Sequence, residues 1–259
     1  HTYVYVNGTK VGENHYGYND FAFDISKYLT CDGTTENVIS VKVVHQTPSS
    51  RWYSGSGIYR DVELIVTDAV HVSRNGTYVT TPNLATEKDG DVTVKVQTDV
   101  QNDSSAQAAA QIRTTVLDAE GKAVSKAVTT DVTLAANSTA EKEQTLKVNK
   151  PALWSTENPN LYYVQTEVLV GGKVKDTYKT TYGFRYINFD ANTGFSLNGK
   201  NVKLKGVCCT MTMVHSELHQ NVMQYTVRLK SSKKWDVMRS VLLTTHLLLY
   251  CLKHATSWV

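Results

Sequence analysis

The residues best suited to contact a small ligand stand together in one loop. Arg51, Trp52 and Tyr53 are followed by Ser-Gly-Ser-Gly at positions 54–57. Glycine and serine favour turns over regular strands, and an exposed Trp or Tyr ring offers a flat apolar face that can stack on the apolar face of a sugar ring. Trp52 and Tyr53 are therefore candidates to stack on a sugar ring. The alternative is that both rings pack against a neighbouring domain.

A second group of polar and aromatic side chains lies near the start of the chain. His15, Tyr16, Tyr18 and Asn19 follow a segment whose alternation predicts a β-hairpin. Their side chains either line a sugar-binding groove or belong to a solvated loop, and the residue types alone allow both interpretations.

No complete set of metal ligands is visible in the sequence, and no residue is assigned a catalytic role. The cysteines lack the spacing of a metal site and are interpreted as unpaired thiols. All four histidines of the last fifty residues are of a type that could ligate a metal, but the out-of-frame interpretation of this segment given below removes that role. These residues are Cys31, Cys208, Cys209 and Cys251, and His215, His219, His246 and His254.

Composition excludes several classes of protein. With 259 residues and 41% hydrophobic residues, the chain can bury a sizeable core. Without the six basic and two acidic residues of 209–259, the chain has 21 basic and 22 acidic residues. Its net charge is then about neutral, which does not indicate a nucleic-acid partner. The apolar run at 241–252 is too short to span a bilayer.

Residue 1 lies inside an alternating strand, so we expect the natural N-terminus to lie upstream. Any signal peptide would belong to that upstream segment, so the sequence does not indicate the cellular compartment.

Residues 1–68 have the pattern of part of a β-sandwich. An Asn7-Gly8 turn joins two alternating segments at 2–6 and 10–12, which predicts a tight hairpin. Further strands are expected at 21–25, 37–43 and 60–66. So few strands leave one apolar face of a sheet uncovered.

The sequence pattern of residues 69–185 predicts a second all-β domain. Short alternating segments, separated by turn residues, describe an immunoglobulin-like sandwich without the Cys-Trp-Cys signature of antibodies. The expected strands are 71–80, 91–101, 111–118, 139–148, 161–170 and 173–184. Residues 186–208 continue with short β segments that lead into what we expect to be a third domain.

Three stretches carry a resemblance to a known family. The loop and strand at 51–60, Arg-Trp-Tyr-Ser-Gly-Ser-Gly-Ile-Tyr-Arg, is similar to the end of the sugar-binding sandwich of glycoside hydrolase family 2. Residues 151–162 resemble its immunoglobulin-like domain, and 183–207 its entry into the barrel. Within that family the chain looks most like the bacterial β-galactosidases. The resemblance implies a sugar-binding role for Arg51, Trp52 and Tyr53.

The resemblance implies a jelly-roll sandwich, an immunoglobulin-like sandwich and a (β/α)₈ barrel that hydrolyses a β-glycosidic bond with retention. Such a reaction needs two carboxyl groups about 5–5.5 Å apart, and in a barrel these lie at the C-terminal ends of strands. Neither glutamate of the family maps onto a residue here. The resemblance also allows a cation near the sugar in the intact enzyme, and it leaves the oligomeric state open.

After residue 208 the composition changes abruptly. All 15 glycines and all 4 prolines lie before position 207, whereas all 4 methionines lie at 211 or later. Read one base out of register, Met211 with Thr212 encodes only Asp, and Met213 with Val214 only Gly. Residues 209–214 then permit His-His-Asp-x-Gly, which the family would place here.

A second family motif fits the same shifted frame. Residues 239–246 permit Ile-Arg-x-x-His-Asn-Pro, and Trp235 with Asp236 encodes only Gly. We therefore hypothesise that one nucleotide was lost near the codon of Cys209, so that 209–259 is an out-of-frame translation of the barrel. The alternative is a genuine, divergent C-terminal domain. Gene decay and a sequence error would both give the frame-shifted pattern.

The sequence thus predicts an all-β chain: a partial jelly-roll (galactose-binding-like) sandwich at 1–68, an immunoglobulin-like sandwich at 69–185, the start of a truncated barrel at 186–208 and an out-of-frame tail at 209–259. The expected function is that of the non-catalytic N-terminal part of a retaining, β-galactosidase-like glycosidase, inactive as written, whose partner is carbohydrate. The alternative is a stand-alone carbohydrate-binding or adhesive β-sandwich protein.

Overall fold

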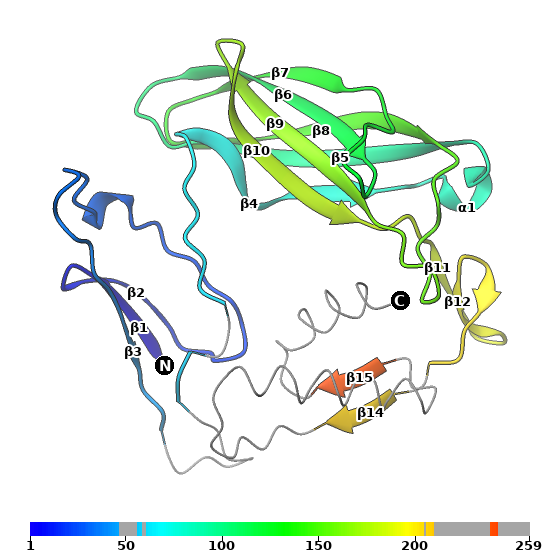
Figure 1. The fold of residues 1–259 in the computed structure, drawn as a ribbon, viewed down its shortest axis with the longest axis horizontal. Helices are drawn as coiled ribbons and strands as arrows, with labels where there is room; N and C mark the ends of the chain where they lie inside the picture. The colour runs from blue at the N-terminus through cyan, green and yellow to red at the C-terminus, as the bar shows by residue number, and fades with distance from the viewer. Residues whose placement is uncertain (47–55, 59–60, 205, 210–238, 243–259) are drawn as a thin grey trace. The chain divides into compact units, whose positions relative to one another are not determined.

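A computed structural model describes residues 1–46, 56–58, 61–204, 206–209 and 239–242. Their regular elements are almost all β-strands, apart from the short helix α1 (Leu84–Glu87) and a 3-10 turn at Ser26–Tyr28 (Figure 1). They form two compact units, built mainly from His1–Glu63 and from Leu64–Val207. None of the described helices is long and apolar enough to cross a membrane. The expected all-β class is confirmed.

The first unit contains a three-stranded antiparallel sheet. Its order is β2-β1-β3, with strands β1 (Thr2–Val6), β2 (Thr9–Asn14) and β3 (Ile39–Val43). Asn7 and Gly8 have φ angles of 50° and 81°, which is the geometry of the type I′ turn that joins two twisted strands. The hairpin expected from the Asn-Gly pair is confirmed.

Two of the expected strands are not formed. At 21–25 the side chain of Asp24 accepts a hydrogen bond from the backbone N–H of Ser26 at 2.8 Å, and such a local bond competes with the ladder that a strand would need. Described residues 61–66 make no ladder either, and Val66 is 84% exposed. Without a neighbouring strand among the described residues, an alternating segment remains extended but is not part of a sheet.

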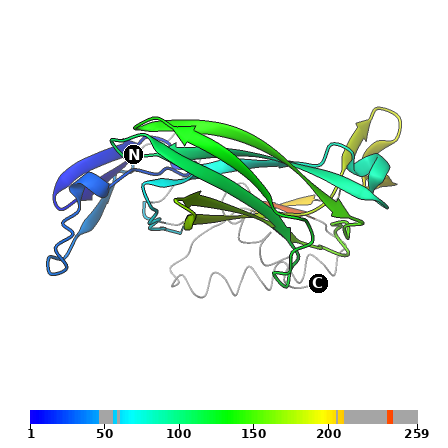
Figure 2. The ribbon, with the colours of Figure 1, turned by 90° about the horizontal axis from the view of Figure 1, so that it is seen from above.

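The second unit is a sandwich of two antiparallel sheets whose long strands run side by side in Figures 1 and 2. One sheet has the order β4-β5-β8 and the other β10-β9-β6-β7. This is the immunoglobulin-like arrangement expected for 69–185. The first sheet contains β4 (Val70–Thr80), β5 (Asp91–Asn102) and β8 (Ser138–Asn149), and the second β6 (Ala108–Leu117), β7 (Val128–Leu134), β9 (Tyr162–Val170) and β10 (Lys173–Tyr182).

Alternation along the strands places every second side chain in the core. In β5, Val92, Val94, Val96, Thr98 and Val100 are fully buried, whereas the residues that alternate with them are more exposed. This is the period-2 pattern of a sheet with one covered face.

A layer of polar side chains divides this core into two apolar clusters. Along β5, Val96 belongs to one cluster and Val100 to the other, and the buried Thr98 lies between them. Three other strands each contribute one buried polar residue to this layer, and in β6 and β9 that residue likewise lies between buried apolar residues of the two clusters. The three polar residues are Thr114 in β6, Gln144 in β8 and Thr166 in β9.

Gln144 connects this layer across the two sheets. Its Oε1 accepts a hydrogen bond from the hydroxyl of Thr114 at 2.6 Å. Its Nε2 donates hydrogen bonds to the carbonyl oxygens of Ile112 at 2.9 Å and Val128 at 3.1 Å. Gln144 belongs to one sheet, whereas its partners belong to the other. Because a buried polar group is costly unless it is paired, this layer favours one alignment of the sheets.

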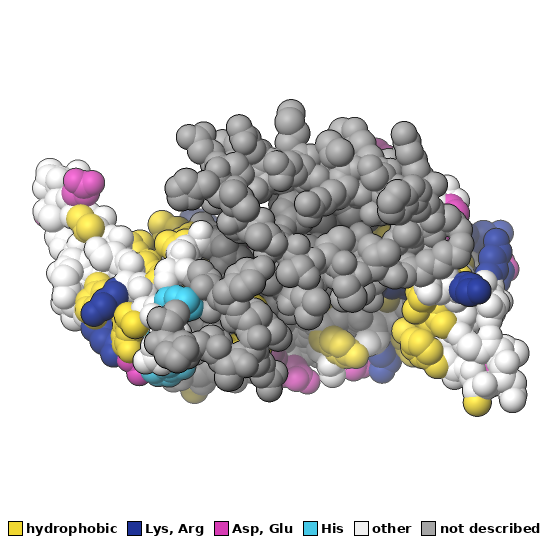
Figure 3. Space-filling model, turned by 90° about the horizontal axis from the view of Figure 1, so that it is seen from below, with side chains coloured by type: hydrophobic (Ala, Val, Ile, Leu, Met, Phe, Trp, Pro, Cys, Tyr) yellow, Lys and Arg dark blue, Asp and Glu magenta, His cyan; other side chains and the backbone are white. Residues whose placement is uncertain are grey.

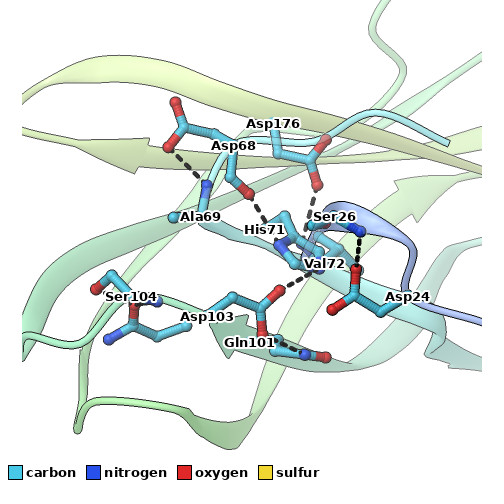
Figure 4. A network of polar contacts seen from close by, with 11 residues as sticks. Asp24, Ser26, Asp68, Ala69, His71, Val72, Gln101, Asp103, Ser104 and Asp176 are labelled. Atoms are coloured by element: carbon cyan, nitrogen blue, oxygen red, sulfur yellow. Dashed lines mark hydrogen bonds and ion pairs between the residues drawn. The ribbon is translucent and has the colours of Figure 1, made fainter. Parts of the chain in front are cut away.

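Side-chain contacts also join the edge strands β4 and β10, which belong to different sheets. Figure 4 shows one of them at the start of β4, where the backbone N–H of Val72 donates to Asp176. His71 donates from Nδ1 to the carbonyl oxygen of Asp68 nearby. The row of contacts consists of Lys175 to Asp68 at 2.9 Å, Val72 to Asp176 at 2.9 Å, Thr77 to Thr180 at 2.7 Å and Thr81 to Tyr182 at 2.9 Å.

Tyr182 makes the stability of this sandwich sensitive to alkali. Burial raises the pKa of its phenol above the ordinary 10.0, although the hydrogen bond with Thr81 opposes the shift. The phenol of Tyr182 therefore ionises at a lower pH in the unfolded chain than in the folded one. The stability that results from this difference is complete below about pH 10 and is lost as the pH rises further. We expect Tyr182→Phe to lower the free energy of unfolding by about 0.5–1.5 kcal/mol at neutral pH. In alkali the variant should lose less additional stability than the parent chain does. Urea unfolding on both sides of pH 10 measures this, and equal alkaline losses in both proteins would contradict it.

Beyond the sandwich, a small antiparallel sheet follows in the order β11-β12-β13. Its strands are β11 (Ile187–Asp190), β12 (Gly194–Leu197) and β13 (Lys200–Asn201). Two further strands, β14 (Gly206–Cys209) and β15 (Arg239–Leu242), form a separate two-stranded sheet.

Candidate functional site

The loop predicted to bind sugar lies outside the described residues. Arg51, Trp52 and Tyr53 belong to the range 47–55, so their role stays a prediction from the sequence. The second candidate group, at 15–19, is described and can be built from its contacts.

The second strand of the hairpin, β2, carries the polar side chains of this group. The carboxylate of Glu13 accepts a hydrogen bond from the ammonium of Lys10 at 2.5 Å, and it lies 3.0 Å from Nε2 of His15. At the end of the strand, Nδ2 of Asn14 donates to the carbonyl oxygen of Tyr16 at 2.7 Å and to Oδ1 of Asn19 at 3.1 Å. Asn14 therefore holds the segment that follows β2 in a compact turn.

Aromatic rings extend from this turn. Tyr16 is 61% exposed, and its ring lies edge to face with that of Tyr18, with a distance of 5.5 Å between centroids. Exposed apolar and histidine side chains are visible in the space-filling view of Figure 3. An exposed aromatic ring beside amide and carboxylate groups offers both the stacking face and the hydrogen-bonding groups that recognise a sugar.

The charges of the group favour ion pairing over acid catalysis. Hydrogen bonds from Lys10 and then from His15 lower the pKa of Glu13, and the bond to Glu13 raises the pKa of Lys10. A general acid needs a carboxyl that stays protonated near neutral pH, and Glu13 has the opposite shift. Its chemistry is therefore that of an exposed hydrogen-bond acceptor.

His15 also contacts another histidine. The Nδ1 atoms of His1 and His15 are 2.8 Å apart, so one ring donates and the other accepts. Within the described ranges, no group of three or more His, Cys, Asp or Glu side chains could hold a metal ion.

Of the predicted group, the structure brings His15, Tyr16, Tyr18 and Asn19 together around Asn14. Sequence reasoning missed Asn14 and Glu13, which organise the turn. The sequence could have indicated Glu13, because Lys10 and Glu13 are close together in β2, His15 follows directly after its end, and both basic side chains can pair with a carboxylate.

A second cluster lies at the junction between the sandwich and the small sheet. The guanidinium of Arg185 lies 4.7 Å from the centroid of the Trp154 ring, and Nδ2 of Asn198 donates to the carbonyl oxygen of Trp154 at 2.9 Å. Near this junction the sequence predicts an interdomain pair between Arg185 and Asp190. Asp190 instead caps its own turn by accepting the backbone N–H groups of Asn192 and Thr193. This cluster holds secondary structure in place.

Two family models match the chain over adjacent ranges. The sugar binding domain of glycosyl hydrolases family 2 matches residues 1–68, and the model for glycosyl hydrolases family 2 matches residues 70–185.

Known proteins of similar sequence and structure indicate the same family. The chain is 39% identical over 206 residues to a putative beta-glucuronidase of Formosa agariphila and 36% identical over 206 residues to a beta-galactosidase of Bacteroides ovatus. These alignments cover 79% of this chain but only 18% and 24% of the relatives. A solved family 2 structure from Bacteroides cellulosilyticus superposes with a TM-score of 0.74 at 36% identity, over 81% of this chain and 28% of that one. The two models and these relatives agree, and the chain belongs to glycosyl hydrolase family 2.

Proposed function

We propose that residues 1–208 are the non-catalytic, sugar-binding and immunoglobulin-like part of a retaining glycosidase that acts on β-galactosides. The observation that carries the proposal is the order of the two family matches, at 1–68 and 70–185. Relatives named as a beta-galactosidase and as beta-glucuronidases support a β-linked sugar as the substrate class.

We infer that the chain as given does not hydrolyse its substrate. Retaining hydrolysis needs an acid and a nucleophile about 5–5.5 Å apart. By family resemblance both belong to a barrel whose motifs follow residue 208 only in the shifted reading frame. The lowered pKa of Glu13 makes the carboxyl of the described candidate site unsuited to the role of acid.

The tail is compatible with this proposal. β15 has four residues and pairs with the equally short β14, and a lone pair of strands is marginally stable in water. We propose that residues 209–259 are an out-of-frame translation and contribute neither a catalytic group nor a ligand.

Binding without turnover is the expected behaviour of the purified 259-residue chain. Titration with a β-galactoside, followed by calorimetry, should give saturable binding, whereas a chromogenic β-galactoside should not be cleaved. Trp52→Ala should weaken binding about tenfold, the equivalent of 1.4 kcal/mol, because it removes the predicted stacking ring.

The matched control is Tyr78→Ala, which removes an exposed ring of the second unit and should leave the affinity unchanged. Titration with a β-glucuronide distinguishes the two substrate classes. Equal binding by the chain and by its Trp52→Ala variant would contradict the role of Trp52, and turnover would contradict the proposed lack of catalysis.

A further inference from the structure

The sequence contains three Asn-Gly pairs, and the structure surrounds them differently. They are Asn7-Gly8, Asn75-Gly76 and Asn198-Gly199. In each pair the asparagine has a positive φ, of 50°, 56° and 52° respectively. Glycine has no side chain to shield its backbone nitrogen, so an Asn-Gly pair is the sequence in which that nitrogen attacks the preceding side-chain amide most easily.

At Asn7 the side-chain amide is held on both sides. Nδ2 donates to the carbonyl oxygen of Tyr28 at 2.9 Å and to Oδ1 of Asn37 at 2.8 Å. Oδ1 accepts the backbone N–H of Val38 at 2.9 Å. The amide carbon cannot turn toward Gly8 unless these bonds break.

Asn198 is held in the same way at the junction of the small sheet. Nδ2 donates to the carbonyl oxygen of Trp154 at 2.9 Å, and Oδ1 accepts the backbone N–H of Tyr186 at 3.2 Å. Its own backbone N–H donates to the carbonyl oxygen of Tyr186 at 2.9 Å. Both the side chain and the backbone of Asn198 are therefore fixed.

Asn75 has no such partners. It is exposed, and its side-chain amide makes no hydrogen bond with any part of the chain that the structure describes. It lies in a bulge of the edge strand β4, where the register with β5 shifts between Val72 and Thr77. A bulge interrupts the regular ladder, so Asn75 and Gly76 have no partner residue in the register between β4 and β5.

We propose that Asn75 is the site at which the folded protein deamidates spontaneously. The backbone nitrogen of Gly76 loses its proton and attacks Cγ of Asn75, and the amide nitrogen leaves as ammonia. Water then opens the resulting succinimide ring at either carbonyl and gives aspartate or isoaspartate. The net reaction consumes one water, releases one ammonia and requires no oxidant or cofactor.

The modification would act on the contacts between the two sheets. Isoaspartate routes the backbone through the former side chain and lengthens it by one methylene. Two residues later, Thr77 makes its 2.7 Å contact with Thr180 of β10. A longer backbone at 75 displaces Thr77, so the conversion loosens the row of contacts between β4 and β10.

Peptide mapping by mass spectrometry, after incubation of the folded chain in mildly alkaline buffer, tests this proposal. We expect Asn75 to convert about tenfold faster than Asn7 or Asn198, because two or three hydrogen bonds of ordinary strength must break at those sites. In concentrated urea the three rates should become similar, since the local sequences then decide them. Conversion of Asn7 or Asn198 at the rate of Asn75 in the folded chain would overturn the proposal, as would an unreactive Asn75.

A variant tests the protective role of the hydrogen bonds directly. Asn37→Ala removes one acceptor of the Asn7 amide and should accelerate conversion at Asn7 while leaving Asn75 unchanged. Circular dichroism of that variant verifies that it is folded. An unchanged rate at Asn7 would show that the contacts do not protect it and would contradict the physical basis of the proposal.

Discussion

Replacing Phe184 by alanine is expected to lower the free energy of unfolding of the second unit by about 3–5 kcal/mol. Phe184 is fully buried, and its ring lies perpendicular to those of Tyr162 and Tyr182, at centroid distances of 4.8 and 5.3 Å. Removing the ring leaves a cavity among valines and leucines that the surrounding strands cannot close. Urea unfolding, followed by tyrosine fluorescence, measures the loss.

The matched control is Phe189→Ala in the neighbouring strand β11. Phe189 is 71% exposed, so its removal should change the unfolding free energy by no more than about 0.5 kcal/mol. Similar losses in the two variants would contradict the placement of Phe184 in the core.

The polar layer around Gln144 leads to the second large effect. Gln144→Ala removes the partner of the buried Thr114 hydroxyl and of two carbonyl oxygens, and it also leaves a cavity. We expect a loss of about 2–4 kcal/mol, because unpaired buried groups add to the cost of the cavity. Chemical denaturation of the purified variant provides the measurement.

Gln144→Met separates the two causes, because methionine fills the space but cannot pair with the polar groups. It should lose about 1–3 kcal/mol through the unpaired groups alone. A methionine variant as stable as the parent would show that the hydrogen bonds of this layer do not stabilise the sandwich.

The strands of the sandwich were predictable because each one shows its own alternation. β5 reads Val-Thr-Val-Lys-Val over 92–96, and burial of one face follows from that pattern. The hairpin at Asn7-Gly8 was predictable for a similar reason, since the turn chemistry is local. The same period places Gln144 on the inward face of β8, together with Leu146 and Val148.

The contacts between distant residues were not predictable. No local pattern shows that Gln144 meets Thr114, which lies thirty positions away in the other sheet. Asn198 could be recognised as a turn residue, but its bond to Trp154 depends on how the two segments pack. Segments 21–25 and 61–66 have strand-like alternation, yet a strand also needs a partner for its ladder. The candidate site was predictable only as a group of residue types, because Asn14 sets its shape.

Sequencing of the gene across the codon of Cys208 shows whether the family 2 sugar-binding region is followed by its barrel in a shifted reading frame. We expect the downstream DNA to encode both His-His-Asp-x-Gly and Ile-Arg-x-x-His-Asn-Pro in one neighbouring frame, which a single added nucleotide would rejoin to residues 1–208. An uninterrupted coding sequence whose neighbouring frames contain neither motif would contradict this frame shift.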